Sequence, residues 1–192
     1  RARVQNALAG CVRAEMERRA LASPVPPALV LSPRGFDIIA ETKLRSPALG
    51  ALRAAVDEDT AARVQTYAAA GAAAVSVLTE PSRFDGSLQH LAQAAAALAV
   101  ARVPAMRKDF LVDPYQVMEA RVAGAGGVLV ILRMLARTEI VALMETAAAL
   151  GLFVLLEAFD EADLDLAGEL AEGTGERVTG ISLPVLVGLN CR

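Results

Sequence analysis

The sequence predicts an α/β fold in which parallel strands alternate with helices. Six short apolar runs have the length and composition of buried strands, and five longer stretches with helical spacing separate them. Parallel pairing needs a crossover of this kind between successive strands. The expected strands are 37–41, 73–78, 103–107, 127–132, 152–157 and 185–190. The expected helices are 58–70, 86–99, 114–123, 137–149 and 160–171.

Polar residues at the ends of the apolar runs distinguish between two architectures built from such units. A doubly wound sheet usually carries a glycine-rich phosphate loop after its first strand, and residues 41–47 (ETKLRSP) lack that pattern. A (β/α)8 barrel instead places functional residues at the carboxyl ends of several strands. We therefore predict a single (β/α)8 TIM-barrel domain over 1–192, with its strands in 37–192. Its polar strand-end residues are Glu41, Lys43, Lys108, Glu157 and Asn190.

The segment before the first strand is predicted to form an extra N-terminal helix, residues 1–22. Val4, Leu8, Val12 and Met16 recur there near helical spacing, and a proline-rich break follows at 23–27. Further along the chain, the helix boundaries agree with known capping preferences. Asp57, Asp113 and Pro114 suit helix starts, Gly71, Gly124 and Gly151 suit helix ends, and 173–182 is expected to be a loop.

The length of the chain differs from that of a complete barrel. Such a barrel has eight strands and about 250 residues, whereas this chain has 192 residues and stops after its sixth expected strand. We therefore expect a barrel truncated after strand six, with the edges of its first and sixth strands unpaired. We also expect the chain by itself to be inactive or nearly so.

Composition excludes several classes of protein. The formal net charge is −3 and no Lys/Arg run is present, so a nucleic-acid partner is not expected. No apolar run of membrane-spanning length is free of charged residues, which argues against a spanning helix. The first 20 residues also contain several charges, which argues against a signal peptide. Cys11 and Cys191 have neither zinc-ligand nor disulfide spacing, so no metal is expected and a cytoplasmic location is predicted.

Lysine is rare in this chain and occurs at two equivalent places. Only Lys43 and Lys108 are lysines among 19 basic residues, and each ends an apolar run. The Lys ammonium can give or take a proton when buried, whereas Arg stays charged. This placement indicates acid–base or phosphate chemistry, although Lys also ends strands simply as a solvated charge.

The neighbours of these lysines suggest a site inside the barrel. Glu41 and Lys43 are two residues apart, so both side chains should point to the barrel interior. An ion pair there would keep both groups charged, and a purely structural salt bridge is the alternative interpretation. Lys108 is followed by Asp109 and Phe110, which we expect to supply a nearby charge and an apolar wall.

The later strand ends carry further candidates. Glu157 follows an apolar run, so we expect it to be a buried proton shuttle, or else a carboxylate paired with a basic residue. Asn190 can orient a hydroxyl group, and Arg192 can hold a carboxylate or phosphate through two hydrogen bonds.

Several loop and helix residues are ambiguous. Ser46 and Pro47 belong to a long loop that suits either phosphate binding or a simple turn. Phe84 could cover an aromatic substrate ring or merely pack. His90 is expected at the surface of a helix, and four methionines are expected to fill the core. They are Met106, Met118, Met134 and Met144.

Four groups of residues, in this order and spacing, resemble the indole-3-glycerol-phosphate synthase family. They lie in 39–47 (IAETKLRSP), 76–88 (SVLTEPSRFDGSL), 107–116 (RKDFLVDPYQ) and 188–192 (GLNCR). The resemblance extends from Ile38 to Arg192, and it implies a (β/α)8 barrel with an extra N-terminal helix. Ala48 departs from the family pattern, in which Ser often follows Ser-Pro, and this departure could cost one phosphate contact.

The resemblance implies a lyase of tryptophan biosynthesis that needs no cofactor. Its substrate would be 1-(2-carboxyphenylamino)-1-deoxyribulose 5-phosphate, which undergoes ring closure with loss of carbon dioxide and water. Lys108 would be the general acid and Glu157 the base for dehydration. Lys43 would contact the substrate carboxylate, Glu41 would orient Lys108, and Asn190 would help to hold the intermediate. The implied substrate-binding residues are Ser46, Pro47, Phe84, Phe110, Leu129 and Arg192.

The resemblance also implies partners, and other activities remain open. The partner would be a phosphorylated small molecule, and no membrane partner is expected. The resemblance is also consistent with fusion to, or association with, other enzymes of the tryptophan pathway. A different phosphate-binding barrel is one alternative. Phosphoribosylanthranilate isomerase would use a Cys/Asp pair, and a sugar-phosphate aldolase would use a Schiff-base Lys without Glu157. A truncated, non-catalytic copy that pairs with a partner is the other alternative.

Overall fold

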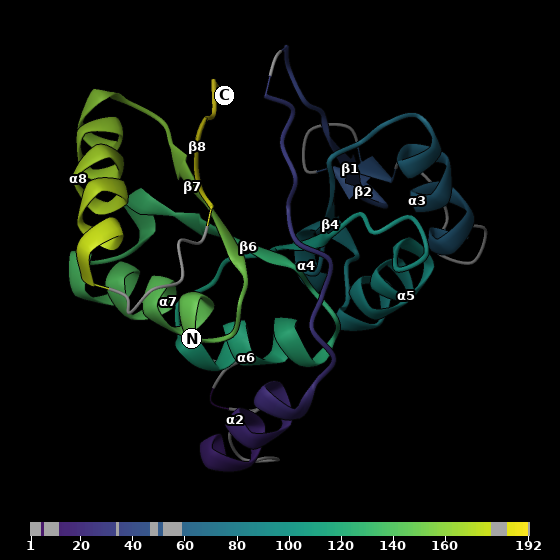
Figure 1. Ribbon diagram of the computed structural model, residues 1–192, viewed down its shortest axis with the longest axis horizontal. Helices are drawn as coiled ribbons and strands as arrows, with labels where there is room; N and C mark the ends of the chain where they lie inside the picture. The colour runs from purple at the N-terminus through teal and green to yellow at the C-terminus, as the bar shows by residue number, and fades with distance from the viewer. Residues whose placement is uncertain are drawn as a thin grey trace. The chain divides into compact units, whose positions relative to one another are not determined.

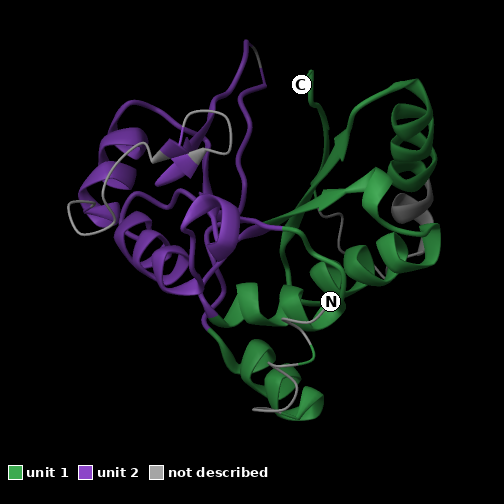
Figure 2. Cartoon of the chain, turned by 180° about the vertical axis from the view of Figure 1, so that it is seen from behind, with its two compact units in different colours: residues 1–23, 110–122, 128–192 green, residues 24–109, 123–127 purple. Residues whose placement is uncertain are grey.

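The computed structural model describes residues 5, 12–33, 35–46, 50–51, 59–177 and 184–191. The chain divides into two compact units, shown in different colours in Figure 2. Unit 2 contains residues 24–109 and 123–127. Unit 1 contains residues 1–23, 110–122 and 128–192. Because each unit has its own internal packing, each is described separately.

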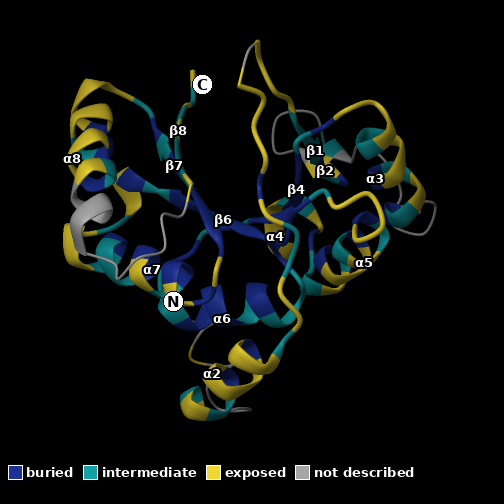
Figure 3. Cartoon of the chain, viewed as in Figure 1, coloured by how far each residue is buried: buried dark blue, intermediate teal, exposed yellow. Residues whose placement is uncertain are grey.

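Unit 2 is built on parallel strands joined by helices. Strand β4 (Ala74–Leu78) lies between β1 (Ile39–Thr42) and β5 (Ala105–Lys108) and pairs in parallel with both (Figure 1). All five residues of β4 are buried, as expected for a parallel strand covered on both faces (Figure 3). The other elements of this unit are α3 (Thr60–Ala69), α4 (Pro81–Phe84), α5 (Leu88–Leu98) and the short antiparallel pair β2 (Arg45–Ser46) and β3 (Gly50–Ala51).

Unit 1 repeats the same alternation. Its strands are β6 (Gly127–Ile131, of which Val128 onward belongs to this unit), β7 (Phe153–Ala158) and β8 (Val185–Leu189), and β7 pairs in parallel with β8. The helices are α2 (Arg13–Ala22), α6 (Pro114–Val122), α7 (Arg137–Ala149) and α8 (Glu161–Arg177), with a 3-10 turn at Leu132–Met134. Parallel strands alternating with helices in both units confirm the predicted β/α-barrel class.

Most of the predicted capping residues have their expected roles. The Asp113 carboxylate accepts a hydrogen bond from the Tyr115 backbone N–H at 2.8 Å, and Pro114 is the first residue of α6. The three predicted helix-ending glycines have positive φ angles, which glycine adopts without the strain that a Cβ causes. These angles are +91° at Gly71, +85° at Gly124 and +72° at Gly151.

Four expectations about local structure need correction. The 1–22 helix is not continuous, because Val12 is extended (φ −63°, ψ 138°) and α2 begins at Arg13. Asp59, whose carboxylate accepts from the Ala62 backbone N–H, caps α3, and Asp57 lies outside the described residues. The expected loop at 173–182 is helical as far as Arg177, because the helix-forming residues of α8 outweigh its glycines. Met134 is 41% exposed and does not fill the core.

The N-terminal helix α2 is fastened to α6 by two arginines. Arg13 donates to the Asp113 carboxylate at 2.7 Å, and the two helices are in contact. Arg121, 4% exposed, donates to the backbone carbonyls of Leu150 at 3.1 Å and Ser23 at 2.9 Å. Burial lowers the pKa of the Arg121 guanidinium.

Within the described residues, no helix combines the length and apolar character needed to cross a membrane.

Candidate active site

A carboxylate held between two lysines lies at the strand ends of unit 2. Glu41, on β1, accepts hydrogen bonds from Lys43 Nζ at 2.6 Å through one oxygen and from Lys108 Nζ at 2.8 Å through the other. Lys43 follows β1 directly, and Lys108 is the last residue of β5. The ion pair between Glu41 and Lys43 that the sequence suggested is therefore present, and Lys108 joins it.

The charges of this cluster support one another. Burial raises the pKa of the Glu41 carboxyl, but hydrogen bonds from Lys108 and Lys43 more than offset this, so the pKa lies below its usual range. The three side chains keep 28–31% of their exposure. The cluster is thus shielded enough to hold an ionised carboxylate and open enough for a small molecule to contact the ammonium groups.

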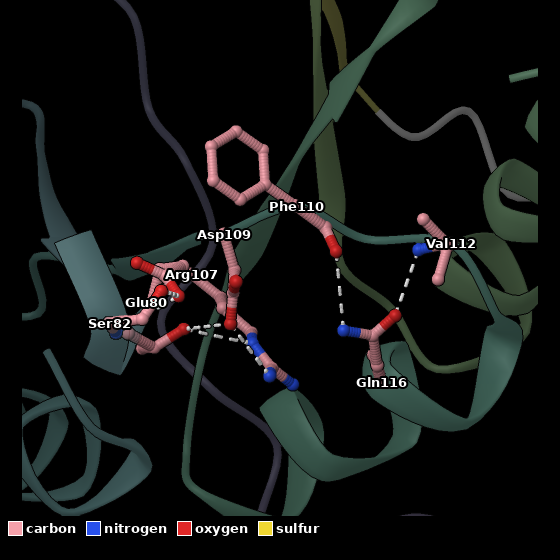
Figure 4. Close-up of polar contacts among 8 residues, drawn as sticks. Glu80, Ser82, Arg107, Asp109, Phe110, Val112 and Gln116 are labelled. Carbon is pink, nitrogen blue, oxygen red and sulfur yellow. Dashed lines mark hydrogen bonds and ion pairs between the residues drawn. The ribbon is translucent and has the colours of Figure 1, made fainter. Parts of the chain in front are cut away.

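A second polar network lies at the ends of β4 and β5, in the same unit (Figure 4). The Asp109 carboxylate accepts from the Thr79 hydroxyl at 2.7 Å and from Arg107 Nη2 at 3.1 Å. Arg107 Nε also donates to the Thr79 hydroxyl oxygen at 3.1 Å. All three residues are 3% exposed. Asp109 was expected to be a charged neighbour of Lys108, and it instead pairs with Arg107.

In unit 1, Glu157 and Asn190 are brought together. Glu157 lies near the end of β7, and Asn190 directly follows β8. Asn190 Nδ2 donates to Glu157 Oε1 at 3.2 Å, and the Asn190 backbone N–H donates to the Ala158 carbonyl at 2.8 Å. Glu157 is half-buried, and among the described residues the Asn190 amide, not a basic side chain, is the hydrogen-bond partner of its carboxylate.

The loop that carries Phe110 is held by one glutamine of α6 (Figure 4). Gln116 is 3% exposed. Its side-chain carbonyl accepts from the Val112 backbone N–H at 2.8 Å, and its amide group donates to the Phe110 carbonyl at 3.4 Å. These bonds fix the backbone from which the half-buried Phe110 side chain extends in unit 1.

The remaining predicted residues belong to different elements of the two units or lie outside the described residues. Phe84 ends α4 and is half-buried, and Leu129, on β6, is 2% exposed. Ser46 lies in β2, part of a hairpin where an irregular loop was expected, and its side chain is not among the described ones. Pro47 and Arg192 lie outside the described residues. His90 is half-buried and lines a small cavity with Lys43, so it is not simply a surface residue.

Sequence reasoning missed two polar features of unit 2. One is the Arg107–Asp109–Thr79 network. Its signal was available, because side chains alternate along a strand and the sequence therefore places Arg107 and Asp109 on the face opposite Lys108. The other is Ser76, 4% exposed, whose hydroxyl has no hydrogen-bond partner within the described structure. Ser76 is the register partner of Glu41, so both side chains lie on one face of the sheet.

A metal centre is not evident in the part of the chain that the structure describes. No three His, Cys, Asp or Glu side chains gather there as ligands would. The parallel strands, which carry carboxylate, lysine and asparagine side chains at their carboxyl ends, define a β/α-barrel protein.

Comparison with known proteins identifies the family. The family model of indole-3-glycerol phosphate synthase matches residues 2–182, and the chain belongs to this family. The chain is 45% identical to the indole-3-glycerol phosphate synthase of Salinibacter ruber, over 74% of this chain and 51% of the relative. It is 40% identical to indole-3-glycerol phosphate synthase 2 of Streptomyces coelicolor, over 89% and 64%.

A third relative extends the match over most of this chain. The indole-3-glycerol phosphate synthase of Mycobacterium tuberculosis is 37% identical over 91% of this chain and 62% of its own length. Across these three relatives, the chain therefore spans between 51% and 64% of their length.

Proposed function

We propose that the whole protein is an indole-3-glycerol phosphate synthase. It would close the ring of 1-(2-carboxyphenylamino)-1-deoxyribulose 5-phosphate with loss of carbon dioxide and water, as a carboxy-lyase of tryptophan biosynthesis. The observation that carries this proposal is the Glu41 carboxylate held by Lys43 and Lys108 at 2.6 and 2.8 Å, in a chain of this family.

Lys108 is the proposed general acid. A substrate ring carbon attacks the ribulose carbonyl carbon, and the Lys108 ammonium gives a proton to the carbonyl oxygen as it gains negative charge. The hydrogen bond to Glu41 directs this ammonium. Glu41 would also stabilise the cationic intermediate formed by ring closure.

Lys43 and Glu157 are assigned to the later steps. Lys43 would bind the substrate carboxylate until carbon dioxide leaves, because the ammonium group is a compact donor and a full positive charge. Glu157 would then take the ring proton whose removal accompanies loss of the hydroxyl group as water. Asn190, which donates to Glu157 at 3.2 Å, would orient that carboxylate and hold the intermediate.

The remaining contacts are proposed from the family. Phe84, Phe110 and Leu129 would line the pocket for the aromatic ring, and Ser46, Pro47 and Arg192 would bind the phosphate end or balance its charge. The three relatives described above are all named as synthases, which supports this activity over the isomerase and aldolase alternatives. A cytoplasmic location and association with other pathway enzymes stay predictions.

Formation of the fluorescent indole-3-glycerol phosphate tests the proposal. It should be followed for this chain and for a version extended to the length of the relatives. We expect product from the extended version and little from the 192-residue chain. Glu157→Gln in the extended version should abolish most of the activity. Absence of product in both versions would contradict the proposal and favour a non-catalytic copy that binds a partner.

A further inference from the structure

The backbone of Lys108 is held from the face opposite its own side chain. Lys108 lies between Arg107 and Asp109 in the sequence, and side chains alternate across a strand. The Lys108 ammonium therefore reaches Glu41 on one face of β5, while its two neighbours bond to each other and to Thr79 on the other face. We call the trio Thr79, Arg107 and Asp109 the buried clamp.

The buried clamp also joins β5 to β4. Thr79 directly follows β4, and its backbone N–H donates to the Lys108 carbonyl at 3.0 Å. Its hydroxyl group donates to Asp109 at 2.7 Å and accepts from Arg107 at 3.1 Å. The residue that follows β4 thus contacts the lysine backbone and both of its sequence neighbours, which restricts rotation of the peptide that carries the Lys108 side chain.

Burial makes this arrangement well defined. Charge-assisted hydrogen bonds between groups that are 3% exposed are shielded from competing water. In contrast, the Glu41–Lys108 pair keeps 28% and 31% of its exposure. The partly buried Glu41–Lys108 pair therefore has a fully buried network on the opposite face of the same strand.

We propose that Thr79, Arg107 and Asp109 are positioning residues that hold Lys108 against Glu41. The expected effect on kcat rests on the proposed function, whereas the positioning of Lys108 is a property of unit 2 alone. Loss of the buried clamp should lower kcat about tenfold to a hundredfold with little change in KM, because small displacements of a catalytic group cost rates of that order.

Two variants separate positioning from stability. Thr79→Val removes one hydroxyl and keeps the shape of the residue. The double variant Arg107→Met with Asp109→Leu replaces both charges together, and replacing a whole buried pair by apolar residues is often neutral for stability. Arg121→Met, which removes a buried arginine from unit 1, is the matched control for a general loss of stability.

The pKa of Glu41, measured by carboxyl carbon-13 NMR, distinguishes positioning from stability. A purely structural role of the buried clamp would leave this pKa unchanged. The Lys108 hydrogen bond helps to lower the Glu41 pKa. We therefore expect this pKa to rise in both clamp variants, toward its value in Lys108→Met, and to stay unchanged in Arg121→Met. Folded clamp variants with unchanged Glu41 titration and unchanged kcat would overturn the inference. If the unaltered extended protein makes no product, the proposed function fails, and the NMR titration still decides the inference.

Discussion

Lys108 and Glu41 lie 67 positions apart in the sequence, and their charged groups meet at 2.8 Å. Neither residue alone specifies a reaction, because ion pairs at strand ends are often structural. Together with Lys43 they form a carboxylate with an ammonium on each oxygen. In this arrangement the carboxylate fixes both lysines, and each lysine keeps further N–H donors free of Glu41.

Lys108→Arg tests whether this ammonium transfers a proton. Arginine can keep the charge and a hydrogen bond to Glu41, but it does not release its proton at ordinary pH. We expect kcat in the extended protein to fall by roughly a hundredfold to ten-thousandfold, the usual contribution of general acid catalysis. Steady-state kinetics measures this fall. Arg137→Lys, at an exposed ion pair with Glu169, is the control, and near-normal kcat in Lys108→Arg would exclude the acid role.

Glu41 should make stability depend on acidic pH. Its pKa is lowered in the folded protein, where the lysine hydrogen bonds outweigh burial. A lowered carboxyl pKa contributes stability above the unfolded-state value, and this contribution is lost as pH falls through the folded-state value. Glu41→Gln should therefore be destabilising at neutral pH and progressively less so on acidification. Urea unfolding of both proteins across this range measures the difference, and a pH-independent difference would contradict the pKa shift.

Arg121→Met should destabilise unit 1. The substitution removes the donor to the Leu150 and Ser23 carbonyls and leaves these acceptors to find other partners. Each buried group without a partner costs about 1–3 kcal/mol, so we expect a loss of roughly 2–4 kcal/mol in the free energy of unfolding. Arg18→Met, at an exposed pair with Glu15, should change it by less than about 1 kcal/mol. Equal effects in chemical denaturation would show that the burial of Arg121 is unimportant.

Gly86→Ala should be destabilising because the chain passes directly over the end of β4. A Cβ at Gly86 would lie 2.7 Å from the Leu78 carbonyl carbon and 2.9 Å from that of Thr79, both of them backbone atoms. Overpacking of this kind costs about 1–3 kcal/mol. Gly168→Ala, on α8 with nothing within 4 Å, should instead stabilise by up to about 1 kcal/mol. Thermal unfolding of both variants checks whether Gly86→Ala lowers the Tm and Gly168→Ala raises it.

Ser76→Ala should stabilise unit 2 by about 1 kcal/mol, because the buried hydroxyl has no partner in the described structure. Ser87→Ala is the comparison, since Ser87 caps α5 by accepting from the His90 backbone N–H at 3.1 Å. That variant should lose about 0.5–2 kcal/mol. Destabilisation by Ser76→Ala in urea unfolding would indicate that an internal water satisfies the hydroxyl.

Local pattern accounts for the elements that were predicted well. The expected helix over 137–149 matches α7 from end to end, and the expected strands differ from the observed ones by two residues or fewer at either end. Such agreement follows because hydrophobic period and capping chemistry act over a few residues. The prediction failed where local signals conflict. The glycines at 173–175 indicate a loop, yet the α8 helix continues through them to Arg177.

By itself, the sequence determined the alternation of strands and helices, the family, and the placement of Glu41 and Lys43 two residues apart at the end of one strand. Only the tertiary structure decided that Lys108 bonds to Glu41, that Asp109 turns to Arg107 instead, and that Asn190 contacts Glu157. The physical reason is strand register. A slip of one residue between paired strands would move every side chain to the opposite face, and register depends on packing between segments far apart in the chain.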